Sequence, residues 1–231
     1  MFDFRFKMPN SGNLEDHGNH YYSFDYKGVH YVTIDWDHVF YLKPEDKLAA
    51  LSWLRNDLEK AHINPAINFK VFYSHRPFYC PQADGDHCKI FFHTKPFQDV
   101  MTKYGIDLYL NSHTHQYYRL KKQMDLQNYS GKSADRLPLI IITGANGTDT
   151  DSAAADEPQS NHIYAPDMAD YMYTEETDPD FQSAYLELLT TPTKISGQLI
   201  RSSDLKVLDS FELPKMDRSS AGDQLIKKAA L

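Results

Sequence analysis

Residues 68–75, Asn-Phe-Lys-Val-Phe-Tyr-Ser-His, and residues 106–115, Ile-Asp-Leu-Tyr-Leu-Asn-Ser-His-Thr-His, decide the fold of this chain. Each stretch is a short apolar run that ends in a histidine, which is typical of a buried strand. A segment with helical spacing of apolar residues precedes each of them, at residues 44–62 and 94–104. This alternation of strands and helices predicts an α/β fold with parallel strands.

The segments on either side extend this pattern. Residues 21–35 predict a hairpin with its turn at Lys27-Gly28, and Pro44 opens the first helix. The apolar positions expected on the buried face of that helix are Leu48, Leu51, Leu54 and Leu58. Residues 144–180, rich in Asp, Ala, Gly and Pro, predict a long surface loop. Further strands are predicted at residues 117–127, 137–143, 184–190, 195–201 and 207–212.

Composition excludes several classes of protein. The chain has 231 residues, 41% of them hydrophobic and 24% charged, as in folded globular proteins. Its net charge of −8 argues against a nucleic-acid-binding protein, which would present a basic surface. No apolar run approaches the roughly 18 residues that a transmembrane helix needs, so we expect no transmembrane segment.

Three histidines follow the two strands that decide the fold. His75 ends the first strand, and His113 and His115 follow the second. Functional side chains gather at the carboxyl ends of parallel strands, so we expect these imidazoles to lie close together. Imidazole is a common ligand of zinc and iron, and the sequence therefore predicts a metal site here.

The two cysteines, Cys80 and Cys88, lie in a turn-rich stretch and leave two interpretations open. They form a disulfide in an oxidising compartment, or they are two free thiols in the cytosol. Two glycosylation sequons, at Asn128 and Asn146, favour the oxidising compartment. Residues 1–9 lack the apolar run of a signal peptide, so a secreted chain would need a leader upstream of them.

The strings around the histidines resemble the purple acid phosphatases, within the calcineurin-like metallophosphoesterases. Residues 73–80, Tyr-Ser-His-Arg-Pro-Phe-Tyr-Cys, and residues 112–119, Ser-His-Thr-His-Gln-Tyr-Tyr-Arg, are similar to segments of the animal-type long-chain branch. Further similar stretches occur in the family's order. They are residues 5–9, 22–26, 141–144 and 206–210.

The resemblance implies a four-layer α/β/β/α sandwich and a two-metal centre of Fe(III) with Fe, Zn or Mn that hydrolyses phosphomonoesters at acidic pH. It makes His75 and His113 ligands of the divalent ion and His115 a ligand of the ferric ion. Arg76 either adds charge to the phosphate pocket or forms a structural salt bridge. Cys80 and Cys88 match the disulfide of the animal-type proteins.

The chain also departs from the family pattern. Ser112 replaces the usual Gly or Ala, and Tyr118 stands where the family usually has Glu. The motifs GDxG, GDxxY and GNHE, which supply the remaining ligands, are missing. Gly18-Asn19-His20 precedes a strand and follows residues 5–9, so we interpret it as a polar turn and not as GNHE.

We therefore expect residues 1–213 to be the C-terminal portion of a metallophosphoesterase domain and residues 214–231 to be a polar tail. The predicted function is that of an acid phosphatase completed by an N-terminal half, with no catalytic residue beyond the metal ligands in this half. That half is its expected partner, and the expected location is extracellular, lysosomal or vacuolar. The alternative is a non-catalytic surface protein of the same fold in an extracellular assembly.

Overall fold

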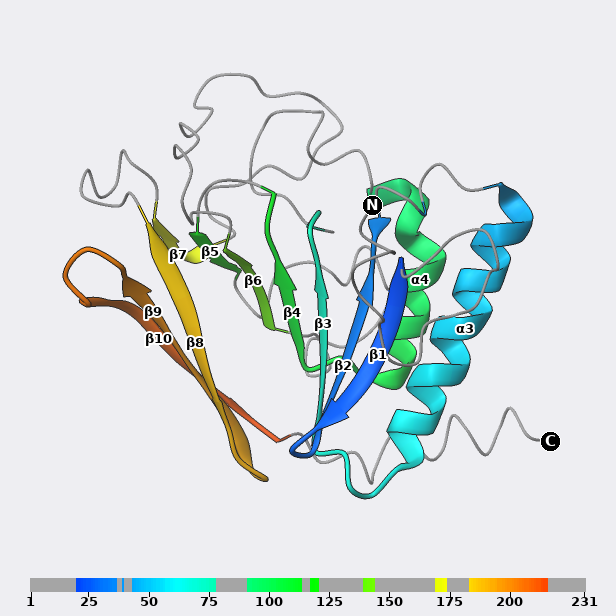
Figure 1. Ribbon diagram of the computed structural model, residues 1–231, viewed down its shortest axis with the longest axis horizontal. Coiled ribbons are helices and arrows are strands. Elements are labelled where there is room, and N and C mark those ends of the chain that lie inside the picture. The colour runs from blue at the N-terminus through cyan, green and yellow to red at the C-terminus, as the bar shows by residue number, and fades with distance from the viewer. Residues whose placement is uncertain are drawn as a thin grey trace, which may run out of the picture.

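The computed structural model describes residues 20–36, 39, 43–77, 91–113, 117–120, 139–143, 169–173 and 183–215. These residues form three layers: two helices, a seven-stranded sheet and a three-stranded sheet (Figure 1). The mixed α/β architecture predicted from the sequence is confirmed.

The seven-stranded sheet has a parallel centre and antiparallel flanks. Its strand order is β1-β2-β3-β4-β6-β5-β7. Strands β2, β3, β4 and β6 are parallel, β1 runs antiparallel to β2, and β5 runs antiparallel to both β6 and β7. The strands are β1 (Tyr21–Tyr26), β2 (Val29–Ile34), β3 (Phe69–Ser74), β4 (Leu108–Asn111), β5 (Tyr117–Leu120), β6 (Leu139–Thr143) and β7 (Ala169–Tyr173).

The turn between β1 and β2 has positive φ at both central residues, 48° at Lys27 and 78° at Gly28. Such a turn matches the twist of a two-residue hairpin. A Cβ at Gly28 would also lie 2.7 Å from the side-chain nitrogen of Asn68, which would have to move aside.

Helix α3 (Pro44–Ile63) connects β2 to β3. Pro44 stands at its start, and acidic residues in the first turn and basic ones in the last complement the helix dipole. Ala50, Leu54, Leu58 and Ala61 form its buried face. The expectation for Leu48 is wrong: its side chain is 63% exposed, because Ala50 occupies the position that faces the sheet in that turn.

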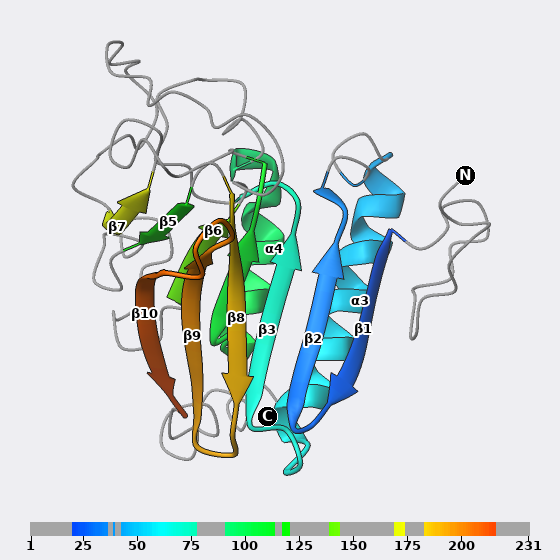
Figure 2. The same cartoon turned by 60° about the vertical axis from the view of Figure 1, so that its left-hand side comes forward.

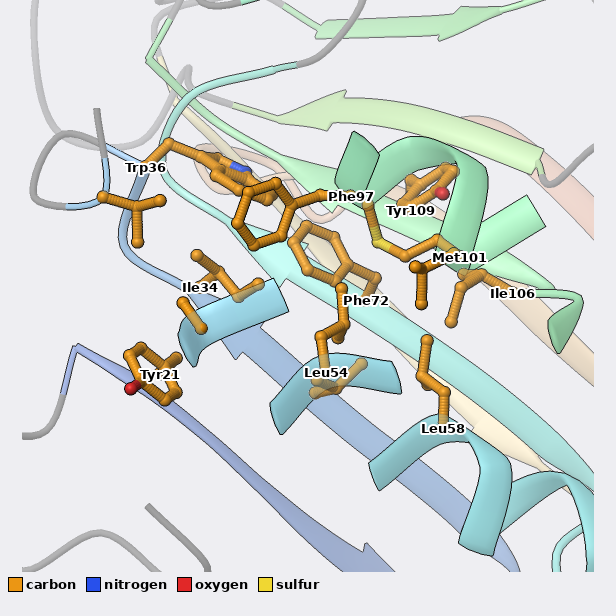
Figure 3. Close-up of a cluster of buried hydrophobic side chains, with 14 of the residues drawn as sticks. Tyr21, Ile34, Trp36, Leu54, Leu58, Phe72, Phe97, Met101, Ile106 and Tyr109 are labelled. Carbon is orange, nitrogen blue, oxygen red and sulfur yellow. The ribbon is translucent and has the colours of Figure 1, made fainter. Parts of the chain in front are cut away.

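Helix α4 (Phe91–Tyr104) connects β3 to β4 and begins three residues before the predicted start. Gly105, with φ of 68°, ends it. Both helices cover the same face of the sheet, and Figure 3 shows the apolar core between them, with Phe97 and Met101 of α4 packed near Phe72 of β3.

The second sheet covers the opposite face. Its order is β10-β9-β8, and all its strands are antiparallel. The strands are β8 (Ala184–Thr190), β9 (Lys194–Arg201) and β10 (Val207–Pro214). Figure 2 shows the second sheet lying against the larger one. A second core contains Ile195, Leu199 and Phe211 of β9 and β10 together with residues of the larger sheet.

One sequence expectation in this region is wrong. Residues 144–180 were expected to form a loop, but β7 lies within them. Its pairing partner is β5, some fifty residues earlier, and such long-range pairing outweighs local composition. Strand β5 is also shorter than the predicted run, and residues 121–138 fall outside the described residues. Among the described helices, none is both long and apolar enough to cross a membrane.

Candidate metal site

Two of the three predicted histidines meet at the carboxyl ends of β3 and β4. The two strands are parallel neighbours with Ser74 opposite Asn111. His75 follows directly, and His113 follows after a turn in which it adopts a positive φ of 73°. His113 Nδ1 lies 3.0 Å from His75 Nε2, and the ring planes are nearly perpendicular, at 80°. The predicted convergence of these two imidazoles is confirmed.

Asn111 connects the two turns that carry the histidines through hydrogen bonds. Its buried Nδ2 donates to the Ser74 hydroxyl at 2.7 Å and to the Arg76 carbonyl at 3.3 Å. The Ser74 hydroxyl also donates to the Arg76 carbonyl, and the Ser112 N–H donates to the His75 carbonyl at 2.9 Å. The histidines are therefore held by the backbone and amide network beneath them.

The spacing of the imidazoles is close to that around a shared metal ion. Two nitrogen ligands about 2.1 Å from one tetrahedral metal ion lie about 3.4 Å apart. The two ring nitrogens here are 3.0 Å apart, at hydrogen-bond distance from each other, so a small separation of the rings would admit an ion. The structure describes no group of three or more His, Cys, Asp or Glu side chains that can hold a metal within the ranges given above. Two imidazoles alone are fewer ligands than a metal site needs, and His115, the third predicted ligand, lies outside the described residues.

The segment after the histidines is anchored to the second sheet. The hydroxyl of Tyr117, the first residue of β5, donates to Asp209 Oδ2 at 2.8 Å. Arg119 donates to both oxygens of the same carboxylate, through Nε at 2.7 Å and a terminal nitrogen at 3.2 Å. Burial, followed by the charge of Asp209, raises the pKa of Tyr117, so this hydroxyl remains a donor. We call Tyr117, Arg119 and Asp209 the inter-sheet clamp.

Other predicted site residues have different outcomes. Arg76 is half-buried, and its role in phosphate binding stays a prediction. His62, which is not part of the predicted site, donates through Nδ1 to the Tyr104 carbonyl at 3.3 Å. His20 directly precedes β1 and pairs with Asp35. The predicted disulfide and glycosylation positions, Cys80, Cys88, Asn128 and Asn146, lie outside the described residues.

Sequence comparison finds relatives of this chain among acid phosphatases. It is 32% identical over 160 residues to acid phosphatase type 7 of Mus musculus, covering 62% of this chain and 35% of the relative. It is 27% identical over 160 residues to purple acid phosphatase 23 of Arabidopsis thaliana, covering 68% of this chain and 32% of the relative. The chain is a homologue of the purple acid phosphatases. The resemblance predicted from its motifs is confirmed, although no family model matches the chain.

Solved structures show the same fold for this homologue. A purple acid phosphatase from yellow lupin (Lupinus luteus) seeds, PPD1, superposes with a TM-score of 0.60 at 16% identity, covering 84% of this chain and 32% of that one. GAP50, the anchor in the inner membrane complex of Plasmodium, superposes with a TM-score of 0.57 at 12% identity, covering 90% and 58%. The chain spans about a third of the length of the sequence relatives it matches.

Sequence analysis did not predict the contacts that anchor β5 to the second sheet or those that Asn111 makes. Tyr117, Arg119 and Asp209 all fall in strings similar to the family, but their mutual contact joins positions about ninety residues apart. One feature of the sequence could have indicated the role of Asn111. This residue ends a buried strand two residues before a histidine, and a buried amide needs a hydrogen-bond partner.

Proposed function

We propose that this homologue is the C-terminal part of a metal-dependent acid phosphatase whose two-metal centre is completed by the remainder of the fold. The observation that carries the proposal is the 3.0 Å approach of His75 and His113 at the carboxyl ends of adjacent parallel strands. In this proposal His115 contributes the third imidazole of this half, and other ligands come from an N-terminal half.

The chain's own residues orient the site. His75 and His113 would hold the divalent ion, which is Fe, Zn or Mn beside Fe(III), and Asn111 would keep their turns together. When bound, the two metals supply Lewis acidity and an activated water for phosphomonoester hydrolysis. Arg76, next to His75, would add positive charge toward the phosphate.

The open edge of β8 supports completion by further strands. The Thr191 N–H donates to the Lys194 carbonyl, and the Ser202 N–H donates to the Ser183 carbonyl. Since the ladder alternates, odd-numbered residues of β8 bond to β9 and even-numbered ones direct their N–H and C=O groups outward. We call these outward residues the edge residues: Ala184, Leu186, Leu188 and Thr190.

This edge lacks the usual protection of an exposed strand. Among the described residues no strand pairs with its outer side. Strand β8 contains one charged residue, Glu187, has no Lys, Arg or Pro, and keeps a regular register. It therefore has few of the charges, prolines and bulges that normally guard such edges. Strands from the remainder of the acid phosphatase fold would pair here.

The β1–β2 side of the larger sheet would pack against those added strands. Figure 2 shows the second sheet over the middle of the larger sheet, with β1 and β2 extending beyond β8. This flank carries aromatic side chains on the face toward the second sheet: Phe24 stacks on Tyr31 at 5.0 Å, and the Tyr73 hydroxyl donates to that of Tyr22 at 2.8 Å. Additional strands beside β8 would bury this aromatic surface.

The cellular location belongs to the same proposal. An extracellular, lysosomal or vacuolar site would accompany a Cys80–Cys88 disulfide and glycosylation at Asn128 and Asn146. Intact mass before and after reduction tests the disulfide, because reduction adds about two hydrogens. An unchanged mass would remove this support.

The decisive test uses the complete protein that includes the preceding coding sequence. We expect that sequence to contain GDxG, GDxxY and GNHE, and the purified protein to contain iron and to hydrolyse p-nitrophenyl phosphate at acidic pH. His113→Ala should reduce the divalent-metal content and nearly abolish turnover. His62→Ala is the matched control, because this imidazole lies in the last turn of α3, which leads to the start of β3, and donates to the Tyr104 carbonyl. Near wild-type turnover in His113→Ala would refute the ligand assignment.

A non-catalytic protein of the same fold is the second candidate. The structural similarity to GAP50, described as an anchor, favours it. It predicts a complete protein without iron and without p-nitrophenyl phosphate hydrolysis, with non-ligand residues at the GDxG, GDxxY and GNHE positions.

A further inference from the structure

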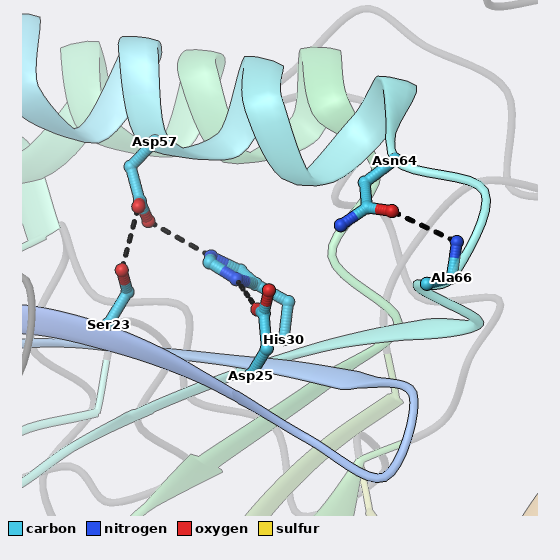
Figure 4. Close-up of polar contacts among 6 residues, drawn as sticks. All are labelled: Ser23, Asp25, His30, Asp57, Asn64 and Ala66. Atoms are coloured by element: carbon cyan, nitrogen blue, oxygen red, sulfur yellow. Dashed lines mark hydrogen bonds and ion pairs between the residues drawn. The ribbon is translucent and has the colours of Figure 1, made fainter.

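A buried histidine joins the first hairpin to helix α3, at the opposite end of the strands from His75 and His113. His30, on β2, has a side chain only 6% exposed. Its Nδ1 lies 2.7 Å from Asp25 Oδ1 on β1, and its Nε2 lies 2.9 Å from Asp57 Oδ2 on α3. The Ser23 hydroxyl donates to the second oxygen of Asp57 at 2.7 Å (Figure 4).

The arrangement demands a doubly protonated imidazole. An ionised carboxylate only accepts hydrogen bonds, and a neutral imidazole has one N–H donor and one lone pair. With a carboxylate oxygen within 3 Å of each ring nitrogen, neutral His30 can satisfy only one of them, and its lone pair faces the other oxygen. The imidazolium donates to both, and charge-assisted bonds of this kind are the stronger ones.

The charges around His30 come from four elements. Asp25 on β1 and Asp57 on α3 contact it directly. Lys70 on β3 is its register partner and lies on the same face of the sheet, where its charge opposes the imidazolium. Asp107, next to β4, accepts the Lys70 backbone N–H at 2.7 Å. Direct contacts therefore favour the charged ring.

We propose that the His30 imidazolium bridges Asp25 and Asp57 at acidic pH and so holds α3 on the β1–β2 hairpin. Deprotonation of His30 weakens that attachment. One bond to α3 or to β1 is lost when the proton leaves. The Ser23–Asp57 bond remains, so the helix stays attached through its apolar face and the change is graded.

The pH window follows from the direction of the shift. Burial lowers the pKa of His30, but the bonds and charges of Asp57 and Asp25 outweigh burial and raise it above 6.5. The stabilisation is complete below the unfolded pKa of about 6.5 and is lost as pH rises through the folded pKa. The imidazolium bridge is therefore complete at acidic pH, where the proposed phosphatase would work. The inference about His30 does not depend on that function.

The first experiment is an NMR titration of the unmodified 231-residue chain with labelled histidine. The His30 signals are assigned by their absence from His30→Gln. We expect His30 to remain protonated to a higher pH than an unfolded histidine, because carboxylates contact both nitrogens of its ring. A His30 midpoint at or below that of an unfolded histidine overturns the proposal.

The second experiment measures unfolding by urea at pH 5.5 and pH 8.5. Each unit by which folding raises the pKa of His30 changes the unfolding constant about tenfold between these limits. We expect His30→Gln and Asp57→Asn to remove most of this dependence. Ser23→Ala, which removes a bond to Asp57 but no titrating group, should keep it. Equal pH dependence in all four proteins overturns the proposal. If His30→Gln fails to fold, Asp25→Asn, at a side chain 53% exposed, gives the same comparison with less disruption.

Discussion

Removing the charge of Asp209 should destabilise the protein far more than removing a surface charge from the same strand. The Asp209 side chain is 2% exposed, and that of Arg119 is 13% exposed. Asp209→Asn would leave the guanidinium without its ionic partner in a largely water-free place. Breaking a buried pair in this way costs about 3–5 kcal/mol, and the partial exposure of Arg119 favours the lower end of that range.

The assay is equilibrium unfolding in urea followed by tryptophan fluorescence. A loss of about 3 kcal/mol, with a slope of roughly 2–3 kcal/mol per molar urea, lowers the midpoint by about 1 M. Glu212→Gln is the matched control on β10, since Glu212 and its partner Lys194 are 64% and 43% exposed. Such surface pairs contribute about 0–1 kcal/mol, so the control should shift by at most about a third as much.

A double-mutant cycle isolates the contact. Arg119→Met and Asp209→Asn should each destabilise the chain, and the double variant should lose less than the sum of the two, because neither charge is then left alone. Equal shifts for Asp209→Asn and Glu212→Gln would refute the assignment of the inter-sheet clamp as a main connection between β5 and β10.

Three further expectations concern packing and the edge. Gly197→Ala should cost about 1–3 kcal/mol in urea unfolding, because its Cβ would lie 2.2 Å from the ring of Phe211, and a compensating Phe211→Leu should recover part of the loss. Asn111→Ala should cost about 1–3 kcal/mol and weaken the nuclear Overhauser contact between His75 and His113, and an unchanged contact would show that the amide does not position them. In hydrogen exchange of this chain, amides of the edge residues should exchange faster than those of the intervening β8 residues, and the opposite order would contradict the open edge.

Local patterns predicted much of the fold. Helix α3 and the strands β3 and β4 each show a pattern among residues that are close together in sequence. Their existence and their order along the chain can therefore be predicted from the sequence. Leu48 shows the limit of such reasoning. It has the correct spacing for the buried face, but only the docking angle of the helix decides that Ala50 faces the sheet.

Contacts between distant segments could not be predicted in the same way. Strand β7 has little local signal and exists through its pairing with β5. The convergence of His75 and His113 was predictable because adjacent parallel strands end at one edge, a rule that needs only the strand order. The bridge from His30 to Asp57 was not, because it depends on how α3 lies across the hairpin.

The second sheet has a consequence for how the protein is made. Residues 184–214 supply the whole of it, and they cover a face of the larger sheet whose described strands begin at residue 21 and whose parallel centre is complete at residue 143. At about 5–20 residues per second, a ribosome needs roughly 4–14 s to pass from residue 143 to residue 214. During this interval the apolar face of each nascent chain lacks its cover, so a chaperone that binds extended apolar surface has its longest opportunity just before the C-terminal strands emerge.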